Sequence, residues 1–256
     1  MIEYEKFIYL DVYKTGSTHI ASLLKSTVRG KPVRRIRHAP LTAGRPFSRK
    51  GGKLVFATVR NPWDWYVSYW AYSLSEDKAF YQHVLKASGA DIAKKLYDKS
   101  NPKESFGLWM RAIHDPVFLS KATENNRLST SGLADLLGLY SYRFMRVTTP
   151  YPAIFLRRFF MPNMDRAIAW QKRWAFYDVV FKSENLDADF RAFVRDNGER
   201  LGFVNNAVDI LDNENATHKN TSERVLASYR DYYDDELRDI VARRDRLIID
   251  LFDYQF

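Results

Sequence analysis

The sequence predicts an α/β fold, with a small parallel sheet flanked by helices. Three short apolar runs have the length of buried strands: FIYLDVY at 7–13, LVFATV at 54–59 and YDVVFK at 177–182. The stretches between and after these runs carry helical periodicity. Strands that are separated by helices along a chain favour a parallel sheet with helices on both of its faces.

The first third of the chain sets up two strand-to-helix connections. A turn at 14–18 follows the first strand, and apolar residues at helical spacing follow that turn. A further short strand is expected at 33–37, and a loop rich in proline and glycine at 39–53. Pro62 suits the first turn of the next helix, which carries the sequence WDWYVSYWAYSLS.

The remainder is predicted to be mostly helical, from about 76 to 175 and again after the third strand run. A helix through Phe190 and Phe193 is expected to close near Gly198, and the polar segment 205–220 is expected to be a loop. An amphipathic helix is predicted from about Asp234 to the end. The helices expected in the middle region cover 79–86, 90–97, 105–113 and 165–174.

Length and composition limit the classes of protein. The 256 residues fit one domain over residues 1–256, with the helical part at about 76–175 as an elaboration. A hydrophobic content of 46% indicates a globular protein, and the lack of cysteine excludes disulfides, thiolate catalysis and cysteine-based zinc sites. No apolar run approaches the ~20 residues of a membrane span, and the first residues lack a signal-peptide pattern. We therefore expect a cytoplasmic protein without a transmembrane segment.

The charge balance points to anionic partners. A formal net charge of +9 and a pI near 9.5 favour nucleotides, acidic glycans, nucleic acid or anionic lipid. Charge alone does not choose among these partners, and a soluble protein with a merely basic surface has the same composition.

The segment Lys14-Thr15-Gly16-Ser17-Thr18 is the first candidate binding site. It stands between a strand and a helix, where unpaired N–H groups and the helix dipole attract anions. The glycine permits close approach of the backbone, and the lysine and the two hydroxyl residues add a charge and donors. The alternative is an ordinary helix start, because Ser and Thr are preferred N-caps. The GxxxxGK[ST] spacing of P-loop nucleotidases is absent.

Arg60 and Ser68 form the second candidate site. Arg60 follows a predicted strand, and Ser68 lies about two turns into the next helix. Ligands of α/β sheets bind beyond the carboxyl ends of the strands, where the 14–18 segment also lies. Arg60 would clamp a phosphate through bidentate hydrogen bonds. The alternative is a surface arginine paired with Asp64.

Together these segments resemble the sulfotransferases that use 3′-phosphoadenosine-5′-phosphosulfate (PAPS), specifically the carbohydrate sulfotransferase type, with similarity to bacterial members. YLDVYKTGSTHI resembles the 5′-phosphosulfate loop of that family, and VFATVRNPWDWYVSYW resembles its 3′-phosphate motif. YDVVFKSENLDADF and the C-terminal segment agree with the same family. Tyr13 departs from the family pattern, which usually has proline at that position.

The resemblance implies a P-loop-like sulfotransferase fold and a set of site residues. Lys14, Thr15, Gly16, Ser17 and Thr18 would hold the 5′-phosphosulfate, with Lys14 stabilising the leaving group. Arg60 and Ser68 would hold the 3′-phosphate, and a loop containing Lys219 would close over the nucleotide, unless that loop is simply solvated. No metal is expected.

The implied reaction moves a sulfuryl group from PAPS to a hydroxyl of a glycan or similar acceptor. The reaction needs a general base, and His38 is the leading candidate, because some carbohydrate sulfotransferases use a histidine at this place. His38 could instead be a donor in a polar loop, or bind acceptor without taking a proton, and the base could then be an acidic residue of the middle region. The basic residues at 29–53 would either steer an anionic acceptor or form a solvated surface.

Two other functions fit parts of the sequence. A P-loop kinase-like phosphotransferase is disfavoured because GK[ST] and a clear Mg²⁺-binding acid after a strand are missing. A basic nucleic-acid-binding protein is disfavoured because the basic residues are scattered and no helix-turn-helix, zinc-finger or RNP-like motif is present, so no nucleic acid partner is expected.

Overall fold

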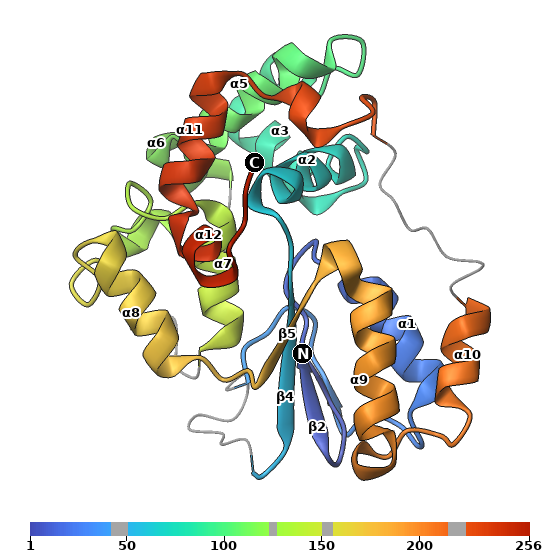
Figure 1. The fold of residues 1–256 in the computed structure, drawn as a ribbon. Helices are drawn as coiled ribbons and strands as arrows, with labels where there is room; N and C mark the ends of the chain where they lie inside the picture. The colour runs from blue at the N-terminus through green and yellow to red at the C-terminus, as the bar shows by residue number, and fades with distance from the viewer. Residues whose placement is uncertain (42–50, 123–126, 150–155, 215–223) are drawn as a thin grey trace. The chain divides into compact units, whose positions relative to one another are not determined.

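The computed structural model describes residues 1–41, 51–122, 127–149, 156–214 and 224–256 (Figure 1). Within these ranges the chain divides into two compact units. The first, the sheet unit, comprises 1–60, 144–152 and 174–220, and the second, the helical unit, comprises 61–143, 153–173 and 221–256. The α/β class is confirmed, and the single sulfotransferase domain stays a prediction. No helix in the described ranges has both the length and the apolar composition of a membrane span.

The sheet unit contains a five-stranded mixed sheet in the order β3-β1-β2-β4-β5. Strands β2, β4 and β5 are parallel, with Leu10 opposite Ala57 and Ala57 opposite Val180. Strand β1 is antiparallel to both β2 and β3, so the prediction of an all-parallel sheet was wrong at this edge. The reason is the three-residue connection between β1 and β2, which is too short for a parallel crossover. The strands are β1 (Ile2–Glu3), β2 (Phe7–Leu10), β3 (Arg34–Arg35), β4 (Leu54–Val59) and β5 (Val179–Lys182).

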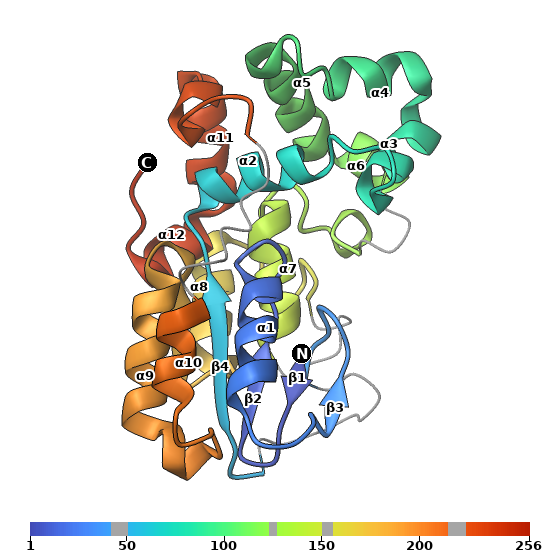
Figure 2. The same cartoon turned by 90° about the vertical axis from the view of Figure 1, so that its right-hand side faces the viewer.

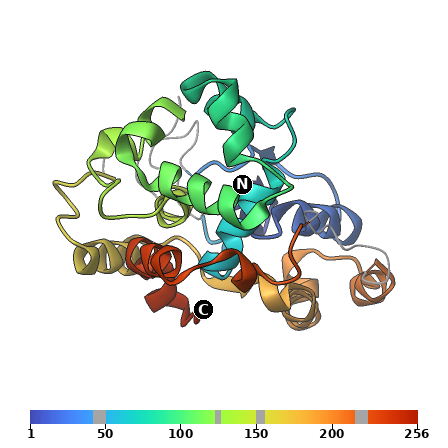
Figure 3. The same cartoon turned by 90° about the horizontal axis from the view of Figure 1, so that it is seen from above.

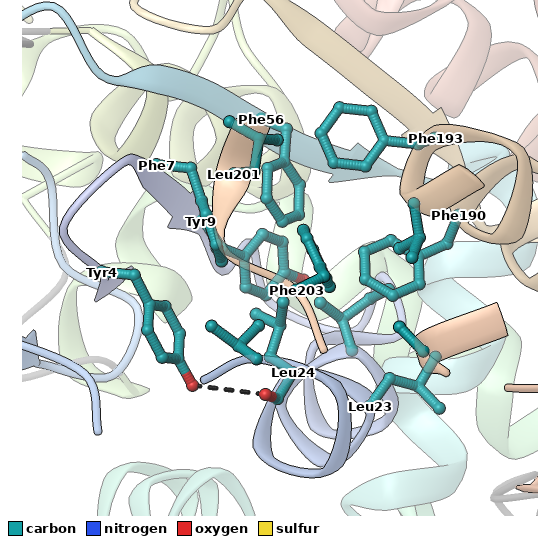
Figure 4. Packing of buried hydrophobic residues seen from close by; sticks show 14 of the residues in the cluster. Tyr4, Phe7, Tyr9, Leu23, Leu24, Phe56, Phe190, Phe193, Leu201 and Phe203 are labelled. Atoms are coloured by element: carbon teal, nitrogen blue, oxygen red, sulfur yellow. Dashed lines mark hydrogen bonds between the residues drawn. The ribbon is translucent and has the colours of Figure 1, made fainter. Parts of the chain in front are cut away.

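Three helices pack on one face of this sheet: α1 (Ser17–Thr27), α9 (Leu186–Leu201) and α10 (Ala207–Glu214) (Figures 1 and 2). The strands contribute alternate residues to the shared core, because successive side chains of a strand point to opposite faces. Phe56 lies near the centre and contacts the ring of Phe193 at a centroid distance of 5.5 Å (Figure 4). Its ring also contacts Phe181 of β5 at 5.6 Å. This aromatic core fixes the strand ends that carry the candidate site.

Two details of this helical layer differ from the prediction. Residues 207–214 form α10 and not a loop, because Ala207 and Leu211, four residues apart, are buried in the core. Helix α9 continues through Gly198 and ends at Leu201, three residues beyond the predicted end, and Gly202, with a φ of 84°, provides the left-handed C-cap that glycine favours.

The helical unit has an aromatic core, and it confirms the helical character predicted for the middle of the chain. Trp65 stacks on Tyr140 at 4.6 Å, and the Trp70 indole donates to the Leu96 carbonyl at 2.9 Å. Its described helices are α2 (Pro62–Tyr72), α3 (Ala79–Ser88), α4 (Ala90–Leu96), α5 (Pro102–His114), α6 (Pro116–Ala122), the first part of α7 (Leu139–Thr148), α8 (Met164–Trp174), α11 (Asp235–Arg244) and α12 (Arg246–Phe252).

The C-terminal segment forms two helices, α11 and α12, where one amphipathic helix was predicted. Helix α12 lies beside α8, where Arg246 of α12 pairs with Asp165 of α8 at 3.1 Å (Figure 3). The break falls at Asp245, whose carboxylate is fully buried. It accepts hydrogen bonds from the Tyr66 hydroxyl at 2.7 Å and from the Ser141 N–H at 2.8 Å. The carboxylate thereby caps the start of α7 from a distant part of the chain.

Asp245 makes the stability of the protein depend on pH. Burial raises the pKa of Asp245 from 3.8 to about 6 in the folded state. The folded state therefore holds this proton more tightly, and the contribution of Asp245 to the free energy of unfolding falls by about 2 kcal/mol as the pH rises from 4 to 6. We expect Asp245→Asn to remove this fall, in urea unfolding measured at pH 4 to 7. The exposed variant Asp239→Asn serves as the control and should retain the wild-type dependence.

Candidate functional site

The connection between β2 and α1 has a backbone conformation suited to an anion. Lys14 has a φ of 58° and Gly16 a φ of 87°, so left-handed residues flank Thr15. Such alternation turns successive N–H groups toward one concavity. Gly16, and not Ser17 or Thr18, is the N-cap of α1, and no side chain among the described residues caps this terminus. The first N–H groups of α1 therefore remain available to an anion, as the helix dipole favours.

Position 16 favours glycine, because Leu186 packs too close for a Cβ atom there. A Cβ at Gly16 would lie 2.6 Å from the Leu186 Cδ2 atom of α9. We expect Gly16→Ala to lower the free energy of unfolding by about 1–2 kcal/mol from the left-handed backbone alone, with the displacement of Leu186 adding to this loss. Gly198→Ala is the matched control. Its Cβ meets only ordinary contacts, the nearest at 3.7 Å, and inside a helix it should add about 0.5–1 kcal/mol. Urea unfolding of the two variants measures both effects.

The Thr15 side chain is buried and makes its hydrogen bonds inside the protein. Its hydroxyl is buried, donates to the Val12 carbonyl at 3.0 Å and lies 2.6 Å from the Thr58 hydroxyl of β4. Thr58 in turn lies 2.9 Å from the Tyr9 hydroxyl. This chain of hydroxyls joins the loop to two neighbouring strands. Any contact of Thr15 with a phosphate would come from its backbone N–H.

Two cations, Lys14 and Arg60, meet at the carboxyl edge of the sheet. Arg60 follows β4, and its guanidinium donates to the Lys14 carbonyl at 3.2 Å. Burial, together with the nearby positive charge of Arg60, lowers the pKa of Lys14 from 10.5 to about 8. A site that depresses the pKa of a lysine in this way favours a bound anion, because an anion restores the electrostatic balance. The alternative partner of Arg60, Asp64, pairs with Arg224 at 2.7 Å within the helical unit.

His38 contacts Asp11 and Tyr13, which belong to the same connection between β2 and α1. Its Nδ1 lies 2.9 Å from the Asp11 carbonyl oxygen, and its backbone N–H donates to the Asp11 carboxylate at 3.0 Å. The imidazole stacks on the Tyr13 ring with a centroid distance of 3.7 Å. His38 itself has a φ of 51°, so its backbone adopts the less common left-handed conformation to make these contacts.

These contacts determine the protonation of the imidazole. A carbonyl oxygen only accepts, so Nδ1 carries the hydrogen and Nε2 carries the free electron pair in the neutral ring. Burial lowers the pKa of His38 below its usual value of 6.5, with the Asp11 contacts opposing that shift. At neutral pH the ring is therefore mostly neutral, with Nε2 able to take a proton.

The predicted site residues fall into three groups. The 14–18 loop, Arg60 and His38 all belong to the sheet unit, where the contacts above bring them together. Ser68 is buried in α2 of the helical unit. Lys219 lies outside the described residues, as does part of the basic 29–53 segment. Arg34 of that segment is used at the sheet edge, where it pairs with Glu3 at 3.0 Å.

Three supporting residues were not found from the sequence. Asp11 supplies the contacts that orient His38, Tyr13 supplies the stacking ring, and Thr58 anchors Thr15. The one available signal was Asp11, a lone acidic residue inside an apolar strand run. Tyr13, noted only as a departure from a family pattern, turns out to contact the candidate base.

Comparison with known proteins adds no family to these observations. No protein-family model matches the chain, and no significant match was found among curated proteins or solved structures. Among the described residues, no group of three or more His, Asp or Glu side chains is arranged to hold a metal ion. The function is therefore argued from the geometry of the site.

Proposed function

We propose that the protein is a PAPS-dependent sulfotransferase that transfers a sulfuryl group to a hydroxyl of a carbohydrate-type acceptor. The observation that carries the proposal is the convergence at one sheet edge of the left-handed loop, two adjacent cations and a neutral histidine. The loop and the cations fit the anionic 5′-phosphosulfate. The histidine fits the proton that the acceptor hydroxyl must lose.

Each residue has a defined part in this reaction. PAPS, when bound, supplies the sulfuryl group, whose bond to the bridging oxygen of the 5′-phosphate breaks as the acceptor oxygen bonds to sulfur. Lys14 and the N–H groups of the loop stabilise the negative charge that collects on that bridging oxygen. His38 takes the hydroxyl proton on Nε2 and becomes an imidazolium. The hydrogen bond to the Asp11 carbonyl keeps the ring in the required tautomer.

The 3′-phosphate of PAPS is the group by which the protein would distinguish this donor from other nucleotides. A 3′-phosphate distinguishes PAPS from ATP, and Arg60 offers a planar fork of donors suited to it. The hydrogen bond to the Lys14 carbonyl uses one amino group of the guanidinium and holds the side chain beside the loop. Ser68 and Lys219 remain proposed partners of the same 3′-phosphate.

A transfer assay distinguishes this function from phosphotransfer. The protein would be incubated with ³⁵S-labelled PAPS, or with γ-³²P-labelled ATP and Mg²⁺, and with a panel of sugars, glycolipids and small hydroxyl compounds. We expect label to move from PAPS and adenosine 3′,5′-bisphosphate to be released in equal amount. Transfer from ATP alone would identify a kinase and overturn the proposal.

Arg60→Ala should weaken discrimination between nucleotides more than it weakens nucleotide binding in general. Loss of the guanidinium should reduce the affinity for adenosine 3′,5′-bisphosphate about tenfold to a hundredfold, because a charge-assisted hydrogen bond contributes about 1.5–3 kcal/mol. The affinity for AMP should change little. Isothermal titration calorimetry measures both constants. Arg195→Ala removes an exposed arginine of α9 and should leave the ratio unchanged. A ratio unchanged in Arg60→Ala would exclude Arg60 from the 3′-phosphate site.

A further inference from the structure

The segment that leads into α8 exposes aromatic side chains next to basic ones. Phe159 is 86% exposed, the highest value among the large hydrophobic residues of the described ranges, and Phe160 beside it is 39% exposed. Their rings contact edge to face at a centroid distance of 5.1 Å. Phe160 also contacts the Trp170 ring of α8 at 5.9 Å. The three rings form one surface, which we call the aromatic patch.

The backbone beneath the aromatic patch is anchored. Leu156 and Met161, on either side of the exposed pair, are fully buried. The Arg158 N–H donates to the Ser131 carbonyl at 3.0 Å, and the Arg158 guanidinium pairs with Asp135 at 3.2 Å. The exposure of Phe159 is therefore a property of a fixed turn and not of a frayed end.

The segment that carries the aromatic patch is rich in basic residues. Residues 156–173 contain five basic residues and one acidic residue, Asp165, which pairs with Arg246 at 3.1 Å. Arg166 and Arg173 stand four residues before and three residues after Trp170, so the three share one face of α8. Arg157 directly precedes the exposed turn. Isolated exposed apolar residues are ordinary, but adjacent aromatic rings rimmed by cations have the composition of an interfacial membrane contact.

We infer that the aromatic patch and its basic rim dock the protein on an anionic lipid surface. Phenylalanine and tryptophan rings insert at the headgroup boundary, while arginine and lysine attract acidic headgroups. The charge of the rim favours a lipid surface over an apolar protein groove, because it matches a continuous layer of negative charge. This inference stands on residues 156–173 and does not depend on the proposed sulfuryl transfer.

Vesicle co-sedimentation of the full chain tests the inference. Vesicles of phosphatidylcholine alone would be compared with vesicles containing 30% phosphatidylglycerol. We expect binding to the anionic vesicles at least tenfold tighter, and a loss of at least tenfold in Phe159→Ser/Phe160→Ser. The control Val117→Ser changes a side chain of α6 that is 63% exposed and is not part of the aromatic patch, and it should bind as wild type.

Two double charge-reversal variants distinguish the effect of the basic rim on vesicle binding from the effect of the overall net charge. Arg157→Glu/Arg166→Glu should lose anionic-vesicle binding at least tenfold, whereas Lys94→Glu/Lys95→Glu, with the same change of charge in exposed positions of α4, should retain most of it. Equal losses in both double variants would show nonspecific attraction and overturn the inference. It would also be overturned if Phe159→Ser/Phe160→Ser changed the oligomeric state in sedimentation velocity while vesicle binding stayed intact, because the patch would then be a protein contact.

Discussion

Replacement of Lys14 by alanine is expected to slow the proposed sulfuryl transfer by a factor of about 10²–10³, the usual effect of removing one donor that faces a developing negative charge. The expectation follows from the position of Lys14 in the left-handed loop and beside Arg60. Steady-state transfer from labelled PAPS measures the effect. Lys25→Ala, which removes the same charge from an exposed position near the other end of α1, should leave the rate unchanged.

The pKa of Lys14 gives the same prediction a pH dependence. Because this pKa is lowered to about 8, the free protein loses the ammonium charge as the pH rises through 8. We expect kcat/KM to fall on the alkaline side of about pH 8, where the profile reports groups of the free enzyme. Lys14→Arg keeps its charge throughout this range, so any activity that it retains should lack the alkaline fall. An alkaline fall that persists in Lys14→Arg would assign the titration to another group.

Replacement of His38 by alanine is expected to lower kcat by about 10²–10⁴, the range that general base catalysis contributes. The affinity for adenosine 3′,5′-bisphosphate should remain, because the ring is assigned to the acceptor proton and not to a phosphate. The rate of the wild-type protein should fall as the pH drops below the lowered pKa of His38, since the imidazolium has no free electron pair. His83→Ala, in the helical unit, is the control and should keep the wild-type kcat.

Tyr13 provides a finer test of the base. Tyr13→Phe keeps an aromatic ring to stack on His38, whereas Tyr13→Ala removes the 3.7 Å contact. If His38 needs this support, Tyr13→Ala should lose rate and Tyr13→Phe should not. A rate that survives His38→Ala would place the base elsewhere, and the arrangement around His38 would then serve only the structure of the loop.

The parts of this fold that were predicted correctly have local signals. The apolar run at 54–59 matches β4 residue for residue. The predicted turn at 14–18 covers the last residues before α1 and the first two residues of that helix. Strand β1 was missed because two residues cannot show a period, and its pairing depends on a hairpin with β2. Helix α10 was missed because its polar residues conceal two buried positions that only the core reveals.

In the candidate site, too, features with a local sequence signal were predicted and features that depend on distant contacts were not. The loop motif and Arg60 could be identified because each follows a strand directly in the sequence. The residues that support His38 could not be identified, because its partner Asp11 lies 27 residues away in the sequence. The contact exists only after the edge of the sheet has folded. The sequence likewise indicated the Thr15 hydroxyl as a phosphate ligand, whereas in the structure this hydroxyl is hydrogen-bonded to that of Thr58, 43 residues away.

Calorimetric titration of the wild-type protein tests the identity of the donor most directly. Adenosine 3′,5′-bisphosphate, AMP, and ATP with Mg²⁺ would be titrated under identical conditions. We expect the bisphosphate to bind at least tenfold more tightly than AMP, and added Mg²⁺ to give no advantage to ATP. Equal affinity for the bisphosphate and AMP, or binding of neither, would contradict this expectation.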